Sequence, residues 1–213
     1  MGRAPRPLVR DGVYHATTRG VRGLPIVLDD DDRAHWLSLL GYVVRRHDWI
    51  CSAFCLMTNH WHAVVQTPNA DISAGIHRLN GIYARYLNDR HGLAGHVFER
   101  RFNSTLVESD RQLAETARYV ELNPVRAGIC DDPTDWPWSS HAAAIGAARP
   151  PRFLDTSAVR AVFSTDDALA RQRYRAFVLD RLLEPDQPKP YSPANRSASR
   201  RTRSAAGSPT TLR

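Results

Sequence analysis

The order of the strand-like and helix-like segments in the first part of the chain restricts the fold. The strand-like segments alternate every two residues, and the helix-like segments have apolar residues at helical spacing. The order is strand, helix, strand, strand, helix, strand, which is that of the split βαβ unit of ferredoxin-like domains. We therefore expect an α+β domain with a four-stranded antiparallel sheet and helices on one face. The expected strands are residues 12–18, 49–57, 60–67 and 102–107, and the expected helices are residues 30–47, 71–90 and 109–123.

Local signals mark where these helices begin and end. Residues 29–32 are four consecutive aspartates ahead of the first helical pattern. Carboxylates complement the dipole at a helix N-terminus, so this run indicates a helix start rather than a metal site. Ser109 and Gln112 have the spacing of a capping box. Pro124 should end the third helix near Asn123, because the residue before a proline avoids helical geometry.

Length and composition fit a soluble domain with flanking segments. Of the 213 residues, 42% are hydrophobic and 24% are charged, which is typical of globular proteins. No apolar run approaches the roughly 20 residues of a membrane span, and the N-terminus lacks the apolar core of a signal peptide, so we expect a cytoplasmic protein without a membrane partner. The expected organisation is a flexible basic N-terminus at residues 1–10, a folded domain at 11–146, a helical extension at 147–184 and a disordered basic tail at 185–213.

The formal net charge of +7 favours a polyanionic partner. Arginine accounts for all but one of the 29 basic residues, and its planar guanidinium matches phosphate oxygens. Six basic residues and one acid lie after residue 184, so the charge is concentrated in the tail and does not by itself indicate a folded nucleic-acid surface. Cys51 and Cys55 lack the spacing of a disulfide framework, and we interpret them as small buried residues of a protein in a reducing compartment.

The third expected strand contains a His-x-His pair. Strand side chains alternate between faces, so His60 and His62 point the same way while Trp61 points to the other face. Neutral imidazole is the commonest metal ligand in proteins, and two from one strand supply part of a coordination sphere. A strand with two surface histidines is the alternative, and the spacing alone does not decide between them.

The third expected helix carries Tyr119 and Asn123, which are four residues apart and so lie about one turn apart on one face. If this helix packs on the sheet face that bears His60 and His62, two imidazoles, an amide oxygen and a phenol come together. Oxygen and imidazole ligands without a thiolate suit Mg²⁺ or Mn²⁺. From the residues alone, Asn123 before a proline is better explained as a helix stop.

Four ordered motifs resemble those of the HUH single-tyrosine transposases. Residues 57–62 resemble the Met-Pro-Asn-His-x-His signature of that family, with Thr58 where the family usually has proline. Residues 95–102 are similar to its Gly-His-hydrophobic-aromatic-x-x-Arg-Phe segment, residues 118–128 to its Tyr-Ile-x-x-Asn-Pro-Val-Arg-Ala-Gly segment, and residues 136–140 to the motif beyond it. The resemblance covers about residues 10–145, and it is best to the REP-associated tyrosine transposases among the insertion sequence 200-like enzymes.

The resemblance implies a chemistry and a set of roles. It implies that Tyr119 is the nucleophile, that His60, His62 and Asn123 hold one Mg²⁺ or Mn²⁺ ion, and that the protein cleaves and rejoins single-stranded or hairpin DNA through a 5′-phosphotyrosine. A homodimer is left open. Three arginines, Arg100, Arg101 and Arg126, are interpreted as phosphate contacts, although as isolated residues they fit solvated ion-pair partners equally well.

Several rival interpretations remain at this stage. A domesticated protein that binds hairpin DNA without cutting it is the main alternative function, and the complete set of motif residues argues against it. A replication initiator or relaxase of the wider HUH class fits less well, because the chain is short and has no helicase region. Tyr83 and Tyr86 are rival nucleophiles, but both lie on a long apolar helix face, which favours a core or base-stacking role.

Overall fold

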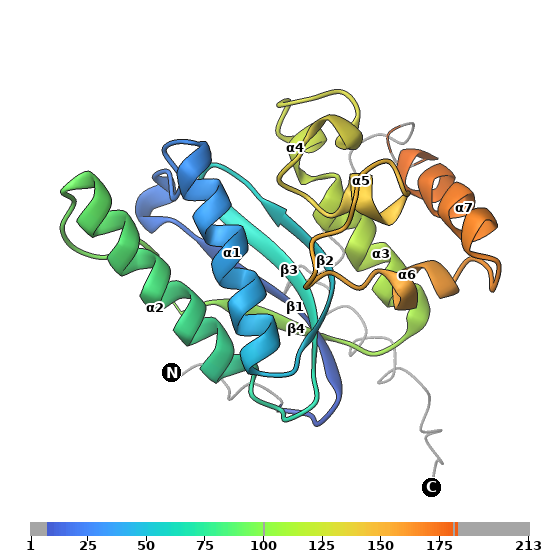
Figure 1. The fold of residues 1–213 in the computed structure, drawn as a ribbon, viewed down its shortest axis with the longest axis horizontal. Helices are drawn as coiled ribbons and strands as arrows, with labels where there is room; N and C mark the ends of the chain where they lie inside the picture. The colour runs from blue at the N-terminus through green and yellow to red at the C-terminus, as the bar shows by residue number, and fades with distance from the viewer. Residues whose placement is uncertain (1–7, 100, 181, 183–213) are drawn as a thin grey trace, which may run out of the picture.

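The computed structural model describes residues 8–99, 101–180 and 182, and its centre is a four-stranded sheet (Figure 1). The strands are β1 Gly12–Arg19, β2 Ile50–Leu56, β3 His60–Thr67 and β4 Asn103–Val107, in the order β2-β3-β1-β4. Every neighbouring pair is antiparallel. The α+β class and the four-stranded antiparallel sheet are therefore confirmed.

Two long helices, α1 Asp30–Arg46 and α2 Ile72–His91, lie side by side on one face of the sheet (Figure 1). Their apolar faces bury a core against alternate residues of the strands. Trp36 of α1 and Tyr83 of α2 are fully buried there, as are Trp61 and Ala63 of β3. Trp61 thus points away from its two neighbouring histidines, as strand alternation requires.

The two helices of the split βαβ unit thus lie on one face, as expected. The helix α3 Asp110–Glu121 packs on the opposite face, which bears His60 and His62. The reason lies in β2 and β3, which are apolar on both sides. Val64 of β3 and Ala53 and Cys55 of β2 are buried with α3 in a second core. The remaining elements are the 3₁₀ turns η1 Val21–Gly23 and η2 Pro133–Asp135 and the helices α4 Asn123–Arg126, α5 His141–Ala144, α6 Ser157–Ala161 and α7 Asp167–Asp180.

The signals at the helix ends act largely as expected. Asp29 caps α1 by accepting a hydrogen bond from the amide of Asp32, which confirms the aspartate run as a helix start. Ser109 caps α3 by accepting from the amide of Gln112. The side chain of Gln112 accepts from the amide of Glu108 rather than from that of Ser109, so the box is shifted by one residue. The helix α3 ends at Glu121, and a separate helical turn, α4, follows.

Further expectations concern the cysteines and the segments at the two ends. Cys51 and Cys55 are buried and free, and burial raises the pKa of the Cys51 thiol to about 12, as expected for inert core residues. The predicted tail at 185–213 and residues 1–7 of the predicted N-terminus lie outside the described residues. Among the helices that the structure describes, we find none with the length and apolar character needed to cross a bilayer.

Candidate active site

His60 and His62 project from the same face of β3, on the side where α3 packs. Their ring centroids are 5.0 Å apart and the two rings are nearly perpendicular. His62 is 5% exposed, whereas His60 is half-buried at the end of the strand. The pair therefore lies at the border of the buried part of the sheet, and His60 is the more accessible of the two rings.

Each of the two imidazoles has a hydrogen-bond partner at Nδ1. The side-chain oxygen of Asn59 is 2.7 Å from Nδ1 of His60, and the amide nitrogen of Asn59 in turn donates to the carbonyl of Gly23 at 3.1 Å. Because an amide oxygen only accepts, Nδ1 of His60 carries the proton in this arrangement and Nε2 keeps its lone pair. Asn59 thereby orients the ring and selects the tautomer that can bind a metal through Nε2.

The partner of His62 is a third histidine, His15 of β1. Its Nε2 is 2.9 Å from Nδ1 of His62, and the two rings stack with centroids 5.1 Å apart. Burial lowers the pKa of His15 to about 4, so His15 is neutral near pH 7. A neutral His15 can accept the Nδ1 proton of His62, and this tautomer leaves Nε2 of His62 unprotonated.

The helix α3 brings Tyr119 to the same histidines. The phenol ring meets the ring of His62 edge-on at 5.7 Å between centroids and that of His15 at 5.8 Å. The ring is half-buried and packs beside the second core, next to the apolar side of α3. The sheet face and the helix thus present two imidazoles and a phenol at one place.

Two opposing effects act on the Tyr119 hydroxyl. Burial raises its pKa above the ordinary value, and the positive charge of Arg126 lowers it. The Arg126 guanidinium lies 5.0 Å from the centre of the phenol ring. Arg126 is exposed and belongs to the short turn α4, which directly follows α3. The turn that begins at Asn123 therefore sets a cation beside the phenol.

The amide of Asn123 takes part in ending α3. Its nitrogen donates to the carbonyl of Tyr119 at 2.8 Å and to that of Val120 at 3.3 Å. The helix-stop role is thus real. This orientation uses the amide nitrogen on the helix carbonyls, and the side-chain oxygen is the atom of Asn123 suited to a metal ion.

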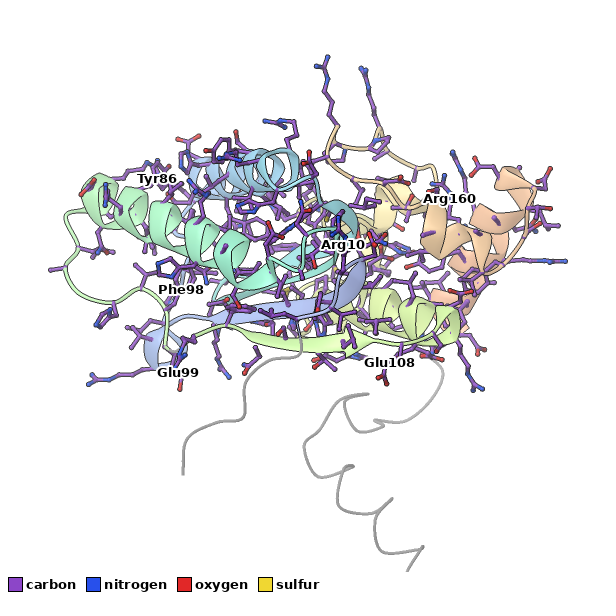
Figure 2. The ribbon with its side chains drawn as sticks, turned by 90° about the horizontal axis from the view of Figure 1, so that it is seen from below. Arg10, Tyr86, Phe98, Glu99, Glu108 and Arg160 are labelled. Atoms are coloured by element: carbon purple, nitrogen blue, oxygen red, sulfur yellow. The ribbon has the colours of Figure 1, made fainter. Side chains whose placement is uncertain are left out.

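The segment that resembles the second family motif runs beside the end of β1 (Figure 2). The amide of Val21 donates to the carbonyl of Val97, and the amide of Glu99 donates to that of Arg19. Phe98, labelled in Figure 2, packs against the first core. Arg101 follows in an exposed position before β4, whereas Arg100 lies outside the described residues.

The rival residues lie elsewhere. Tyr83 is fully buried between α2 and the sheet and donates to the carbonyl of Ile26 at 2.6 Å. Burial raises its pKa far above the ordinary value. Tyr86 stacks on His35 with ring centroids 3.7 Å apart. Both tyrosines therefore belong to the helix layer on the other side of the sheet from His60 and His62.

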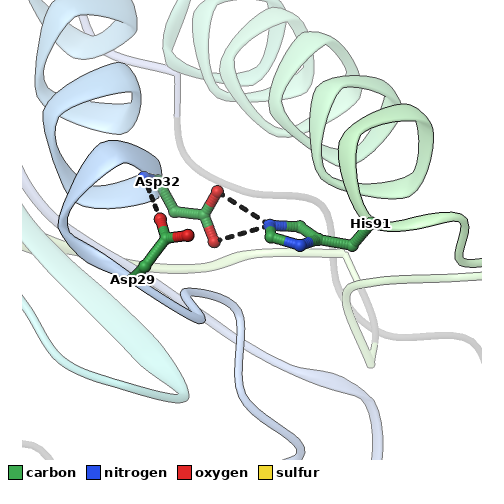
Figure 3. Close-up of side chains that lie close together, drawn as sticks. All are labelled: Asp29, Asp32 and His91. Carbon is green, nitrogen blue, oxygen red and sulfur yellow. Dashed lines mark hydrogen bonds and ion pairs between the residues drawn. The ribbon is translucent and has the colours of Figure 1, made fainter.

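A second group of potential metal ligands, Asp29, Asp32 and His91, joins the start of α1 to the end of α2 (Figure 3). Both carboxylates are already paired, because the guanidinium of Arg90 lies 2.7 Å from Asp29 and 2.5 Å from Asp32. Asp32, fully buried, also accepts from the amide of Leu28 and contacts His91. The group therefore acts as a cap and an ion-pair cluster.

Sequence reasoning missed His15 and Asn59 as parts of the site. Asn59 was visible in the motif, but its role depends on the carbonyl of Gly23, which comes from a distant loop. His15 lies in the first expected strand, where nothing in its spacing distinguishes it. Only the register shows its place: Thr17 pairs with His62, so His15 is diagonal to His62.

Several known proteins resemble this chain in sequence or in fold. A family model described as "Transposase IS200 like" matches residues 14–123. A protein of Haemophilus influenzae described as "Putative REP-associated tyrosine transposase" is 25% identical over 153 residues, which are 63% of this chain and 82% of that protein. A solved structure of a REP-associated tyrosine transposase bound to a REP hairpin has the same fold, with a TM-score of 0.59 and 17% identity, and the match covers 74% of this chain and 94% of that one. The chain therefore belongs to the IS200-like transposase family, as its motifs predict.

Proposed function

We propose that this protein cleaves and rejoins single-stranded DNA, with Tyr119 as the nucleophile. The observation that carries the proposal is the meeting of Tyr119 with the His-x-His pair, at 5.7 Å between the rings of Tyr119 and His62. A phenol is a weak nucleophile near pH 7 and needs positive charge close to it. This site can supply that charge from Arg126 and from a bound cation.

The donor set fits a divalent cation of the Mg²⁺ or Mn²⁺ type. Nδ1 of His60 contacts Asn59 and Nδ1 of His62 contacts His15. In the tautomers that these contacts favour, Nε2 of each ring would be the metal ligand. The side-chain oxygen of Asn123 is the third candidate ligand. The three residues offer imidazole and oxygen and no thiolate, which suits these ions better than a structural zinc. When bound, such an ion acts as a Lewis acid on the scissile phosphate.

The proposed reaction exchanges one phosphodiester bond for another and needs no external energy source. The Tyr119 oxygen forms a bond to phosphorus, the bond from phosphorus to the 3′ oxygen breaks, and the proton of the phenol ends on the released 3′-hydroxyl. The product is a 5′-phosphotyrosine, which is again a phosphodiester, so the energy of the bond is kept for rejoining. Arg126 stabilises negative charge on the Tyr119 oxygen as the hydroxyl loses its proton.

We infer that the substrate is hairpin-forming single-stranded DNA. The support is family membership, together with the relative that was solved with a REP hairpin. Arg101 and Arg126 are exposed and are proposed to contact backbone phosphates. The earlier proposal for Arg100 concerns a residue outside the described part of the chain.

The test is a covalent-adduct assay with labelled single-stranded hairpins and Mg²⁺ or Mn²⁺, analysed on denaturing gels. We expect the wild type to form an adduct and Tyr119→Phe to form none, with a hairpin Kd within about twofold of the wild type because one hydroxyl is lost. Tyr86→Phe, which removes a hydroxyl on the other side of the sheet, is the matched control and should keep the adduct. An adduct in Tyr119→Phe would show that another residue attacks.

The same assay separates the alternative function. A domesticated hairpin-binding protein would bind the oligonucleotide, but neither the wild type nor any variant would form an adduct.

A further inference from the structure

A buried carboxylate lies on α3 between the two residues proposed for catalysis. Glu121 is 0% exposed, and it is two residues from both Tyr119 and Asn123 in the sequence. Three hydrogen bonds satisfy it: it accepts from the hydroxyl of Ser140 at 2.6 Å, contacts Nδ1 of His141 at 2.8 Å, and accepts from the hydroxyl of Tyr174 at 2.8 Å. A buried carboxylate with this many partners has one well-defined position.

The partners of Glu121 all follow the residues 14–123 that the family model matches. Ser140 belongs to the motif at residues 136–140, whereas Tyr174 lies in the segment beyond the resemblance. Ser140 and His141 lie at the start of α5, and Tyr174 lies on α7. Figure 1 shows α5, α6 and α7 gathered on the same side of the sheet as α3. The end of α3 is therefore held by the C-terminal helices rather than by the domain core alone.

A neighbouring contact joins α7 to the same turn of α3. The guanidinium of Arg118 donates to the carbonyl of Phe177 at 3.1 Å and lies 4.0 Å from the centre of the Phe177 ring. Arg118 and Glu121 are on either side of Tyr119 in the sequence, so α7 grips α3 just before and just after the phenol.

The network also reaches the sheet. The amide of Phe54 in β2 donates to the hydroxyl of Ser140 at 3.1 Å, and that hydroxyl donates to Glu121. The strand β2 is hydrogen-bonded along its length to β3, which carries the histidine pair. A continuous path of hydrogen bonds therefore connects the end of α3 to the strand next to His60 and His62.

We propose that Glu121, Ser140, His141 and Tyr174 are positioning residues for strand cleavage, so that the C-terminal helices are a working part of the catalytic unit. The inference rests on the proposed function of Tyr119. The network fixes the last turn of α3 relative to the sheet, and this sets the place of the Tyr119 oxygen and of the Asn123 amide. In such sites a displacement of about 1 Å can lower the rate by about 100-fold.

The experiment compares two single-hydroxyl deletions in the full chain. Tyr174→Phe removes one hydrogen bond to Glu121, whereas Tyr83→Phe removes one equally buried hydroxyl on the other face of the sheet. We expect Tyr174→Phe to lower the single-turnover cleavage rate by about tenfold or more with an unchanged hairpin Kd, and Tyr83→Phe to change the rate by less than about twofold. Similar losses of thermal stability in the two variants would exclude a general effect on folding.

A second readout does not depend on cleavage. Hydrogen–deuterium exchange of the amides at residues 119–123 should rise in Tyr174→Phe and stay unchanged in Tyr83→Phe.

Glu121→Gln, which keeps the shape and one acceptor oxygen, should show a cleavage rate per folded molecule between those of the wild type and Glu121→Leu.

The outcomes distinguish this inference from the proposed function. A wild type that forms no adduct overturns the function of Tyr119, and the exchange rates then decide whether the network holds α3. A cleaving wild type together with wild-type rate and exchange in Tyr174→Phe overturns the positioning role alone.

Discussion

Two groups of side chains in this protein contain residues that bind metals, and only their hydrogen bonds tell them apart. The cluster of Asp29, Asp32 and His91 has the more acidic ligands, but Arg90 already lies against both carboxylates. The pair of His60 and His62 has no carboxylate. Its hydrogen-bond partners at Nδ1 favour the tautomers in which Nε2 is the proposed metal ligand. Residue type alone would favour the cluster over the pair.

The difference also shows in the charges. Arg90 holds the pKa of Asp29 at about 2. Burial raises the pKa of Asp32, but hydrogen bonds from His91, from the amide of Leu28 and from Arg90 outweigh it and leave that pKa below its usual range. These carboxylates therefore use their charge to hold α1 against α2. A metal site instead requires ligand atoms that neighbouring groups orient but that are not engaged in ion pairs.

The largest effect should come from removing both histidine ligands. We expect His60→Ala combined with His62→Ala to abolish measurable Mn²⁺ binding, because the change removes two of the three proposed protein ligands. Asp32→Asn should leave Mn²⁺ affinity unchanged and lower the melting temperature, because it disturbs only the ion-pair cluster. Isothermal titration calorimetry and thermal unfolding measure the two effects. Loss of Mn²⁺ binding in Asp32→Asn would make the cluster the metal site.

A smaller effect should come from the residue behind His62. His15→Leu fills the buried position with an apolar side chain and removes the proposed acceptor for Nδ1 of His62. Loss of such a partner typically costs about 10- to 100-fold in metal affinity, and we expect a decrease in Mn²⁺ affinity of this size. Tyr14→Phe, a change in the same strand on the other face, is the control. Unchanged Mn²⁺ affinity in His15→Leu would mean that His62 is oriented without His15.

What the sequence could predict follows from periodicity. Alternation along the third strand predicted that His60 and His62 share one face of the sheet. Helical spacing predicted that Tyr119 and Asn123 share one face of the third helix. The parts of the candidate site could therefore be found from the sequence. His15 could not be found, because its place depends on the register between β1 and β3. Glu121 could not be found either, since its partner Tyr174 is 53 residues away.

Which face of the sheet the third helix covers could not be predicted, for a related reason. A strand buried on both sides, such as β2, shows a run of apolar residues rather than alternation. That run does not say which helix packs on which side. Family motifs supplied the proposed roles of the site residues, while the structure supplied the contacts around them.

The ion-pair cluster can be examined through its pH dependence. A carboxyl group whose pKa is lower in the folded than in the unfolded protein stabilises the fold above its unfolded pKa, and this stability is lost as the pH falls toward the folded value. For Asp29 the window runs from about pH 4 down to about pH 2. We expect Arg90→Met to reduce the fall in melting temperature between about pH 5 and pH 3 compared with the wild type. An unchanged fall would assign acid sensitivity to other groups.

The smallest effect should come from the cation beside the phenol. Arg126→Met removes a guanidinium 5.0 Å from the Tyr119 ring while keeping most of the side-chain length. Exposed interactions of this kind contribute about 0.5–1 kcal/mol, which corresponds to roughly a two- to fivefold lower cleavage rate. Single-turnover cleavage at saturating hairpin measures it, and Arg101→Met serves as a comparison. If Arg126 acted only as a phosphate contact, both variants would weaken hairpin binding and neither would slow cleavage at saturation. Slower cleavage in Arg126→Met alone would mean that the Arg126 cation acts on the Tyr119 nucleophile. Arg90 differs in that its cation pairs with the carboxylates of Asp29 and Asp32.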